Sequence, residues 1–313
     1  MSTMADMGES RRIRILGGGL VGRLVVSELY YAGNEVTLVD IDEQAIQWAK
    51  DLGVETILED ATGDAILDVT KADIWVNMLP GRLGDKVRRP LLERGATVVD
   101  LAFTLEDPRE MNKLAISNGS TLVYDVGVAP GISNLWIANA LALFESSEEY
   151  ASSIEIRVGG NPCDSDEGWS YMAPFSPSDV IEEYERPARI RINGEIVDRP
   201  ALTDRHLVRD SEVGELEAFL TDGLRSLLDL DCPNMVEYTM RWPGHIEKFV
   251  QLRESGAFTN ENRKSTLSRL YDEWKFNPDR KEMTILLVTI KSENMIWEGR
   301  LFDDGAGGWS SMA

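Results

Sequence analysis

Residues 12–23, RIRILGGGLVGR, join a short apolar strand to a glycine-rich turn. Gly17, Gly19 and Gly22 fit the pattern G-x-G-x-x-G, a weak signal when it stands alone. Here a helical stretch follows and is stopped by Gly33, and a second strand, EVTLVD, then ends on Asp40. Because strand, turn, helix and acidic residue occur in the expected order, the stretch predicts a βαβ unit that binds a dinucleotide. A glycine turn without function is the less favoured interpretation.

Each residue of this pattern has a physical role. Gly17 permits the tight turn, Gly19 lets backbone amides approach a pyrophosphate, and Gly22 lets the helix pack closely on the strand. The first helical residues, Leu20 and Val21, direct the partial positive charge of the helix N-terminus at the phosphates. Asp40 accepts hydrogen bonds from the adenosine ribose and would repel a 2′-phosphate, so NAD is expected rather than NADP.

Further strands follow at the spacing of an α/β domain. An apolar stretch at 54–58 leads to Asp60 and Ala61, which are expected to border the adenine ring. Residues 72–80 end in Leu79, Pro80 and Gly81, and two more strands cover 96–103 and 120–131. The alternation predicts a Rossmann-type doubly wound parallel sheet, whose ligands lie beyond the carboxyl ends of the strands. That edge places 77–81, 100–104 and 125–131 on the nicotinamide side.

The stretch DVGVAPGISN, residues 125–134, is the sharpest local signal after the glycine loop. Pro130 and Gly131 predict a turn, and Ser133 or Asn134 can cap the helix that follows. Asp125 stands at the end of a strand. Its carboxylate could meet a cationic nitrogen of a substrate or bond the backbone amides of the turn, and the sequence leaves both roles open.

The pattern changes after about residue 150. Strand-length segments such as SIEIRVGG and EMTILLVTI occur without regular βαβ alternation, which predicts an α+β domain with a mixed sheet. The expected domains are therefore a dinucleotide-binding domain over residues 12–148 and a substrate and dimerisation domain over 149–313. The irregular segment 163–179 is a lid, a dimer contact or a plain surface loop.

Composition excludes some classes of protein. The net charge is -22, with 54 acidic against 32 basic residues, which argues against a nucleic-acid partner. No apolar run is long enough to span a membrane. Two cysteines with no metal-ligand spacing favour a reducing, cytoplasmic setting and no metal site.

Several segments together resemble one family. They are the glycine loop, DVGVAPGISN, SPSDVIEEYERPARIRINGE (176–195), FLTDGLRSLL (219–228) and TMRWPGHIEK (239–248). In this order they resemble the saccharopine dehydrogenase-like family, from about residue 12 to the end, and within it most closely the L-lysine 6-dehydrogenase branch. Members continue where this chain stops, after residues 310–313, so a truncated chain without a final helix is expected.

The resemblance implies an NAD-dependent oxidoreductase and a homodimer. The implied reaction is oxidative deamination of the ε-amino group of L-lysine to 2-aminoadipate 6-semialdehyde, which cyclises. Two alternatives stay open. One is a dehydrogenase of a secondary amine such as saccharopine or carboxynorspermidine, and the other is an NAD-binding protein without catalytic activity.

An amino-acid substrate gives a reason for the cations of TMRWPGHIEK. Arg241 offers a planar donor fork that matches a carboxylate, and His245 can add a hydrogen bond. We expect Arg241 to anchor the substrate carboxylate, unless it pairs with a neighbouring acid, and Trp242 to pack or wall the pocket. The remaining candidates are Asp100 and Phe103 as substrate-binding residues, Asp125 as the residue that orients the reacting nitrogen, and His245 as the alternative base.

Overall fold

The structure is a computed structural model that describes residues 9–305 and 310–312. The chain divides into two compact units, one that ends at Val126 and one that spans Gly127–Met312. The first unit contains a parallel sheet of six strands, and the second contains a mixed sheet of eight strands. The predicted fold class is therefore confirmed.

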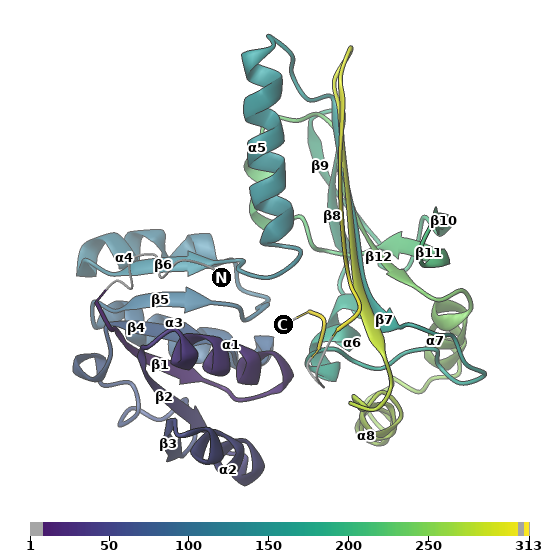
Figure 1. Ribbon diagram of the computed structural model, residues 1–313. Coiled ribbons are helices and arrows are strands. Elements are labelled where there is room, and N and C mark those ends of the chain that lie inside the picture. The colour runs from purple at the N-terminus through teal and green to yellow at the C-terminus, as the bar shows by residue number, and fades with distance from the viewer. Residues whose placement is uncertain (1–8, 306–309, 313) are drawn as a thin grey trace, which may run out of the picture. The chain divides into compact units, whose positions relative to one another are not determined.

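The sheet of the first unit has the strand order β3-β2-β1-β4-β5-β6, and every pair is parallel (Figure 1). The chain starts in the middle of this sheet, runs outward to β3, and then returns past β1 to β4. That reversal creates the switch point at which doubly wound sheets bind ligands. The strands are β1 (Arg12–Leu16), β2 (Glu35–Asp40), β3 (Glu55–Leu58), β4 (Ile74–Asn77), β5 (Thr97–Asp100) and β6 (Thr121–Tyr124).

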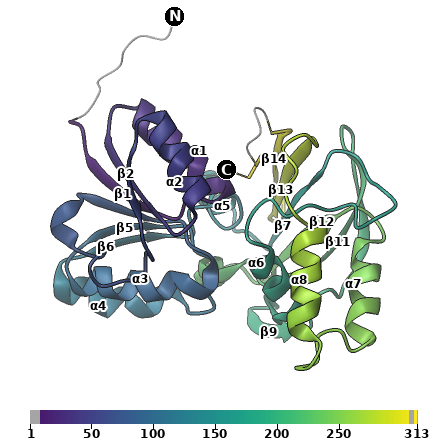
Figure 2. The ribbon, with the colours of Figure 1, turned by 90° about the horizontal axis from the view of Figure 1, so that it is seen from below.

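Helices cover both faces of this sheet (Figure 2). Helices α1 (Leu20–Tyr31) and α2 (Glu43–Leu52) pack on the face that carries Ile15 of β1. Helix α3 (Gly81–Glu93) and helix α4 (Asn112–Asn118) pack on the opposite face. Because both faces are covered, the strands read as nearly continuous apolar runs in the sequence. Two short 3-10 helices, η1 (Val69–Lys71) and η2 (Pro108–Met111), lie in the connections.

The sheet of the second unit is mixed. Its main path runs β10-β11-β12-β7-β13-β14, with β8 pairing β12 and β9. Only the pairing of β7 with β12 is parallel among those described for this sheet. The strands are β7 (Ser153–Pro162), β8 (Ala188–Ile192), β9 (Glu195–Arg199), β10 (His206–Asp210), β11 (Gly214–Leu220), β12 (Met235–Arg241), β13 (Glu282–Lys291) and β14 (Ile296–Asp303).

Helix α5 (Ile132–Ser146) packs on one face of this second sheet and runs beside its long strands (Figure 1). Its buried side chains Ile137, Ala140 and Phe144 share a core with Ile154 and Ile156 of β7. The structure therefore places the boundary between units at Val126 and Gly127, and not at residue 148. In the sequence this helix looks like one more helix of the βαβ alternation, whereas its apolar side is used by the second sheet.

Three further helices build an aromatic core at the other end of the second unit. They are α6 (Pro177–Glu185), α7 (His245–Glu254) and α8 (Arg263–Glu273), and a 3-10 helix, η3 (Arg225–Asp229), precedes β12. Tyr184 of α6, Phe249 of α7 and Leu270 of α8 are fully buried together with Trp274. Rings in this cluster meet edge to face, as aromatic pairs prefer.

The second sheet curls so that its two outer strands touch. Arg300 of β14 bonds the carboxylate of Asp210, the last residue of β10, at 2.8 and 2.9 Å. Side chains from both strands, Val208 and Phe302, pack against the same core inside the curl. The face that the curl encloses is therefore a hydrophobic core, separate from the core that α5 forms on the other face.

Within residues 9–305 and 310–312, no helix is both long and apolar enough to cross a membrane. The same residues contain no group of three His, Cys, Asp or Glu side chains that could hold a metal ion. Cys163 and Cys232 are both free.

Candidate functional site

The carboxyl ends of the parallel strands meet at one edge of the first unit. Strand pairing aligns Leu16 of β1 with Asn77 of β4, and Asn77 with Asp100 of β5. Asp100 is aligned in turn with Tyr124, the last residue of β6. The candidates that follow these strand ends are Gly17, Gly19, Leu20, Val21, Gly22, Asp40, Leu79, Pro80, Gly81, Asp100, Phe103 and Asp125.

The glycine loop has the geometry of a phosphate cradle. Gly17 adopts a φ of 106°, and a Cβ atom at Gly22 would lie only 2.2 Å from the carbonyl oxygen of Gly17. Gly19 is exposed, and a Cβ atom there would meet no described atom within 4 Å. The first hydrogen bond of α1 joins the Arg23 N–H to the Gly19 oxygen, so the amides of the three residues before Arg23 have no acceptor within the helix. No acidic side chain occupies the first turn, which leaves this N-terminus suited to an anion.

Asp40 lies at the end of β2 beside this loop. Its Oδ2 accepts a hydrogen bond from the Gly18 N–H at 2.5 Å, and its Oδ1 accepts one from the Asp42 N–H at 2.7 Å. A carboxylate has about four lone-pair positions, so two more donors can be accepted. The half-buried carboxylate is thus held by the backbone in a fixed orientation and keeps capacity for hydroxyl groups.

Asp60 and Ala61 differ in their surroundings. Asp60 is exposed and accepts hydrogen bonds from the backbone and hydroxyl of Thr62, and these bonds lower the pKa of its carboxyl group. Ala61 is buried in the core on the α3 side of the sheet. The Ala61 side chain is therefore enclosed by the protein, and its predicted place beside an adenine ring stays a prediction.

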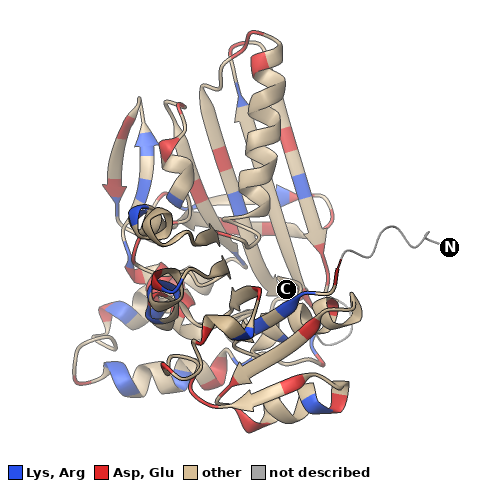
Figure 3. Cartoon of the chain, turned by 90° about the vertical axis from the view of Figure 1, so that its left-hand side faces the viewer, with Lys and Arg blue, Asp and Glu red and all other residues tan. Residues whose placement is uncertain are grey.

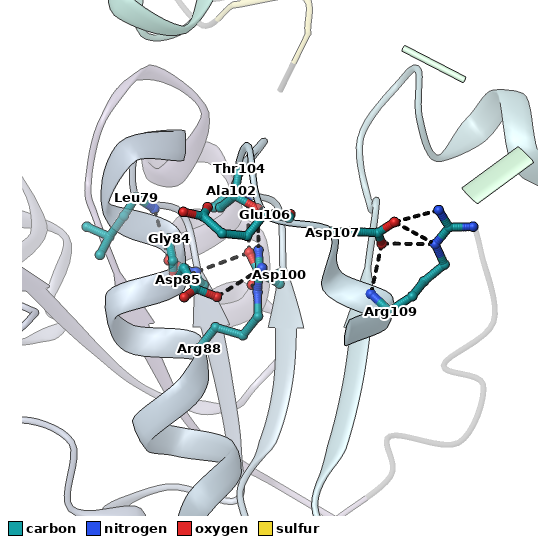
Figure 4. Close-up of polar contacts among 11 residues, drawn as sticks. Leu79, Gly84, Asp85, Arg88, Asp100, Ala102, Thr104, Glu106, Asp107 and Arg109 are labelled. Atoms are coloured by element: carbon teal, nitrogen blue, oxygen red, sulfur yellow. Dashed lines mark hydrogen bonds and ion pairs between the residues drawn. The ribbon is translucent and has the colours of Figure 1, made fainter. Parts of the chain in front are cut away.

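Asp100 is not available to a substrate, in contrast to the role expected from its place at a strand end (Figure 4). Its Oδ2 accepts a hydrogen bond from Arg88 Nε at 2.6 Å, and both side chains are completely buried. Its Oδ1 accepts bonds from Asn77 Nδ2 at 3.1 Å and from the Ala102 N–H at 2.9 Å. With both oxygens engaged under the surface, Asp100 is a positioning residue.

The Asp100–Arg88 ion pair holds two loops in place at the edge where the parallel strands end. Arg88 comes from α3 and also donates to Thr104 Oγ1 at 3.1 Å, which fixes the loop after β5. Asn77 accepts from the Leu79 N–H at 3.3 Å, which fixes the loop after β4. These contacts set the positions of Pro80 and Gly81, where α3 begins. Phe103 is half-buried in the loop between Ala102 and Thr104.

Asp125 lies directly after β6 in a left-handed backbone conformation, with a φ of 56°. Such a φ is uncommon outside glycine, although Asp adopts it more readily than most residues. The side chain is half-buried. Residues held in sparsely populated conformations cluster at functional sites, so this geometry is consistent with a role for Asp125 but does not define it.

The turn after Asp125 forms as the sequence predicts. The Gly127 N–H donates to the Pro130 oxygen at 2.9 Å, and Gly131 has a φ of 140°. A Cβ atom at Gly131 would lie 1.9 Å from the Gly127 oxygen, so only glycine fits. Asn134 Oδ1 accepts from the Gly131 N–H at 3.2 Å and so caps α5.

Arg241 of the second unit is a buried cation with no acidic partner. Its side chain is 3% exposed, Nε donates to the Tyr184 hydroxyl at 2.8 Å, and Nη1 donates to the Met240 oxygen at 3.0 Å. Its guanidinium carbon lies 4.8 Å from the centre of the Tyr171 ring. Among the residues described, no carboxylate lies within ion-pair distance of this guanidinium. The ion pair with a neighbouring acid that the alternative interpretation required is therefore not present among the described residues.

His245 is buried beside Tyr184, the residue that holds Arg241. It is 1% exposed, and burial lowers its pKa to about 3, with the Arg241 charge as the next cause. Nε2 lies 3.1 Å from the Tyr184 hydroxyl, and Nδ1 lies 3.0 Å from the Trp169 oxygen. The tautomer that satisfies both carries its proton on Nδ1. Both ring nitrogens are then occupied, so the structure gives His245 a positioning role in place of the predicted catalytic one.

Trp242 and Lys248 have structural contacts. Trp242 Nε1 donates to the Pro162 oxygen at 2.8 Å, and the indole packs against the core inside the curled sheet. Lys248 Nζ donates to the backbone oxygens of Glu167 and Gly168 and so ties the irregular segment to α7. Among Arg241, His245 and Lys248, the cationic side-chain types of TMRWPGHIEK, Arg241 is the one buried as a charged group.

Sequence reasoning missed the aromatic and polar neighbours of Arg241. Thr239 and Arg241 are two residues apart on β12 and therefore share one face of the sheet. Thr239 donates to Glu183 Oε1 of α6, and its hydroxyl lies 2.8 Å from that of Thr221. Because side chains alternate between the two faces of a strand, the spacing of two residues could have predicted that Thr239 lies on the same face as Arg241. No sequence pattern brings Tyr171, from the irregular segment, over the guanidinium.

Comparison with known proteins assigns the two halves of the chain separately. Residues 127–304 match the family described as the saccharopine dehydrogenase C-terminal domain, and residues 13–77 match the TrkA-N domain. The mitochondrial alpha-aminoadipic semialdehyde synthase of Mus musculus is 25% identical over 61% of this chain and 22% of its own length. The saccharopine dehydrogenase [NADP(+), L-glutamate-forming] of Saccharomyces cerevisiae is 24% identical over 59% of this chain and 43% of its own.

The chain thus spans less than half the length of these curated relatives. Among solved structures, apo saccharopine dehydrogenase (L-Glu forming) from Saccharomyces cerevisiae superimposes with a TM-score of 0.77 at 17% identity. That match covers 96% of this chain and 87% of the other, and it shows a common fold. Since the first family match takes in more than half of the residues, the chain belongs to the saccharopine dehydrogenase family.

Proposed function

We propose that the protein oxidises an amine-bearing carbon of an amino acid with a nicotinamide cofactor, and that its substrate is L-lysine, deaminated at the ε-amino group. The observation that carries this proposal is the buried guanidinium of Arg241, which has no acidic partner among the described residues. An uncompensated buried charge is costly. A substrate carboxylate that binds there would remove the cost, so the side chain is suited to an anionic ligand.

The residues of the first unit fit a dinucleotide. The free amides at the start of α1 would bind the pyrophosphate, and Asp40 would accept the ribose hydroxyl groups. Asp42 and Glu43 follow Asp40 closely and add negative charge. For this reason we propose NAD, although one curated relative is described with NADP(+).

The bound cofactor would supply the hydride acceptor. A hydride leaves carbon only when the nitrogen lone pair is free, so the ε-ammonium must first lose its proton. An unperturbed lysine ammonium has a pKa of about 10.4, so turnover should rise toward alkaline pH unless a neighbouring group lowers that value. Asp125, fixed at the end of β6, is the residue we propose to orient this nitrogen. Water then hydrolyses the iminium, which yields the semialdehyde and releases the ε-nitrogen as ammonium.

A secondary amine such as saccharopine is the second candidate, because relatives of this chain carry that name. Saccharopine has additional carboxylates and would need further free cations near Arg241. Two arginines of the nearby α6–β8 segment, Arg186 and Arg189, contact the carboxylate of Asp222 at 3.4 and 2.9 Å. Their engagement with Asp222 favours the substrate with a single carboxylate.

A substrate panel tests the proposal directly. The protein is mixed with NAD and with L-lysine, saccharopine or carboxynorspermidine in turn, and NADH absorbance is followed from pH 7 to 10. We expect NADH with L-lysine and a rate that rises with pH. If NADH forms with saccharopine alone, saccharopine replaces L-lysine as the substrate. If the protein binds NAD but forms no NADH with any amine, it is a binding protein without catalytic activity.

We also propose a homodimer that uses the second unit. Helix α5 has no charged residue between Ile132 and Phe144, as Figure 3 shows for this helix up to its C-terminal end. Leu135 and Leu143 on it are 67% and 54% exposed. In a chain of charge -22, this uncharged face is where two copies repel each other least. Light scattering after gel filtration should give twice the chain mass, and Leu135→Glu should restore the monomer.

A further inference from the structure

We propose that Glu183 binds the α-ammonium group of the substrate, so that Glu183 and Arg241 together recognise the zwitterionic end of an α-amino acid. This inference rests on the function proposed above and adds a second specificity-determining residue to the same site. Ligands that lack the α-ammonium group should then bind more weakly.

Glu183 lies on α6 beside the residue that holds Arg241. Tyr184, its neighbour in the chain, accepts the hydrogen bond from Arg241 Nε. The Glu183 carboxylate accepts a bond from Thr239 Oγ1, and Thr239 shares its sheet face with Arg241. Residues two apart on a strand are separated by about 7 Å. The carboxylate and the guanidinium are therefore neighbours above one face of β12.

The two opposite charges do not neutralise each other directly. Within residues 9–305 and 310–312, neither Glu183 nor Arg241 forms an ion pair, although several acids and arginines elsewhere in the unit pair at 2.6–2.9 Å. Glu183 is half-buried and has the hydroxyl of Thr239 as its described partner. Its charge still reaches the site: burial raises the pKa of Tyr171 to about 12, the Arg241 charge opposes this shift, and the Glu183 carboxylate adds to it.

A cation and an anion held close together but unpaired are complementary to a zwitterion. The α-carboxylate of an amino acid would bind Arg241, and the α-ammonium would bind Glu183. A ligand that has only the carboxylate would leave Glu183 facing the aliphatic chain, and it would lose one charge-assisted hydrogen bond. Such bonds contribute roughly 1.5–3 kcal/mol, which corresponds to about 10- to 100-fold in affinity.

The test compares two ligands that differ only at this group. L-lysine carries the α-ammonium, whereas 6-aminohexanoate has the same carboxylate and the same terminal amine without it. Calorimetric binding is measured with NADH present, so that no oxidation occurs. We expect wild-type protein to bind L-lysine about 10- to 100-fold more tightly, and Glu183→Gln to remove most of this difference by weakening L-lysine alone. Glu182→Gln, the adjacent acid on α6, is the matched control and should change neither affinity.

The ligand pair separates this role from the other possible roles of Glu183. If Glu183→Gln weakens both ligands equally, the carboxylate stabilises the site or holds the reacting amine, and the proposal is wrong. Equal wild-type affinities for the two ligands would also overturn it. Failure of the proposed reaction has a different signature: L-lysine would be bound with the expected preference, yet wild-type protein with NAD would produce no NADH.

Discussion

Two arginines of this protein are buried to nearly the same extent but have opposite surroundings. Arg88 of the first unit is 0% exposed and forms an ion pair with Asp100 at 2.6 Å. Arg241 of the second unit is 3% exposed and contacts a phenol, a carbonyl oxygen and the face of an aromatic ring. One guanidinium is neutralised by the protein, and the other is only solvated by it.

The difference separates a cation that is paired within the fold from one that we propose binds the substrate. Arg88 joins α3 to the ends of β4 and β5, and its partner carboxylate has no capacity left for a ligand. Arg241 is held in place by Tyr184 and Met240 but keeps its full charge. Burial alone therefore does not identify a functional residue in this molecule. The proposal for Arg241 rests instead on the absence of an ion pair among the described residues.

The largest expected effect is on stability in the first unit. Asp100→Asn removes the nearer of the two carboxylates that contact Arg88, at 2.6 Å, and leaves Asp85 at 3.6 Å; breaking a buried ion pair costs about 3–5 kcal/mol. Urea unfolding should show this loss, with hydrogen exchange placing it at β5 and the α3 start. Asp64→Asn is the control, because the exposed Asp64–Arg94 pair should contribute about 1 kcal/mol or less. Equal losses from the two variants would mean that Asp100 and Arg88 do not depend on each other.

Substitution of Arg241 should affect substrate binding more than stability. Arg241→Met removes a buried charge that forms no ion pair among the described residues, so the free energy of unfolding should fall by clearly less than in Asp100→Asn. Affinity for L-lysine should fall by about 10- to 100-fold, the value of one charge-assisted hydrogen bond, and KM should change more than kcat. Arg253→Gln on α7 removes an exposed cation and should leave both quantities unchanged. A severe loss of stability in Arg241→Met would place Arg241 in the same class as Arg88.

The first unit could be derived largely from the sequence. The glycine loop and Asp40 occupy the predicted positions because strand, turn and helix are encoded within thirty residues of chain. Asp100 was misjudged because its partner Arg88 comes from a helix on the other side of a turn, and no local pattern shows that the two are buried together. The same limit applies to Arg241, since Tyr171 and Tyr184 reach it from segments 70 and 57 residues away. Local patterns locate strand ends and turns, whereas tertiary packing decides which charges are paired.

A third prediction concerns the pH dependence of stability, to which His245 contributes through its place beside the Tyr184 hydroxyl that holds Arg241. The pKa of His245 is lowered by burial to about 3, against 6.5 for an unperturbed histidine. As pH falls from about 6.5 toward 3, His245 therefore binds a proton in the unfolded chain but not in the folded chain. The free energy of unfolding decreases over this range. Between pH 6.5 and 5 this amounts to about 2 kcal/mol. His245→Asn should lack this part of the loss in urea unfolding, whereas His206→Asn should retain it. Identical pH profiles for wild type and His245→Asn would show that His245 is not buried as a neutral ring.

The smallest expected effect contrasts Asp40 with Asp100, the two carboxylates at the nucleotide edge. Asp100 has donors on both oxygens from a buried cluster, but Asp40 is half-buried and is bonded only by two backbone amides. Asp40→Ser should therefore spare stability, weaken NAD by about tenfold through loss of the ribose contact, and improve NADP by removing the repulsion of its 2′-phosphate. The measurement is the ratio of kcat/KM for the two cofactors. Glu43→Gln, which removes a nearby exposed charge, should leave that ratio unchanged. If both substitutions shift the ratio equally, the preference for NAD over NADP follows from the total negative charge at this edge. Asp40 would then have no specific role in binding the ribose.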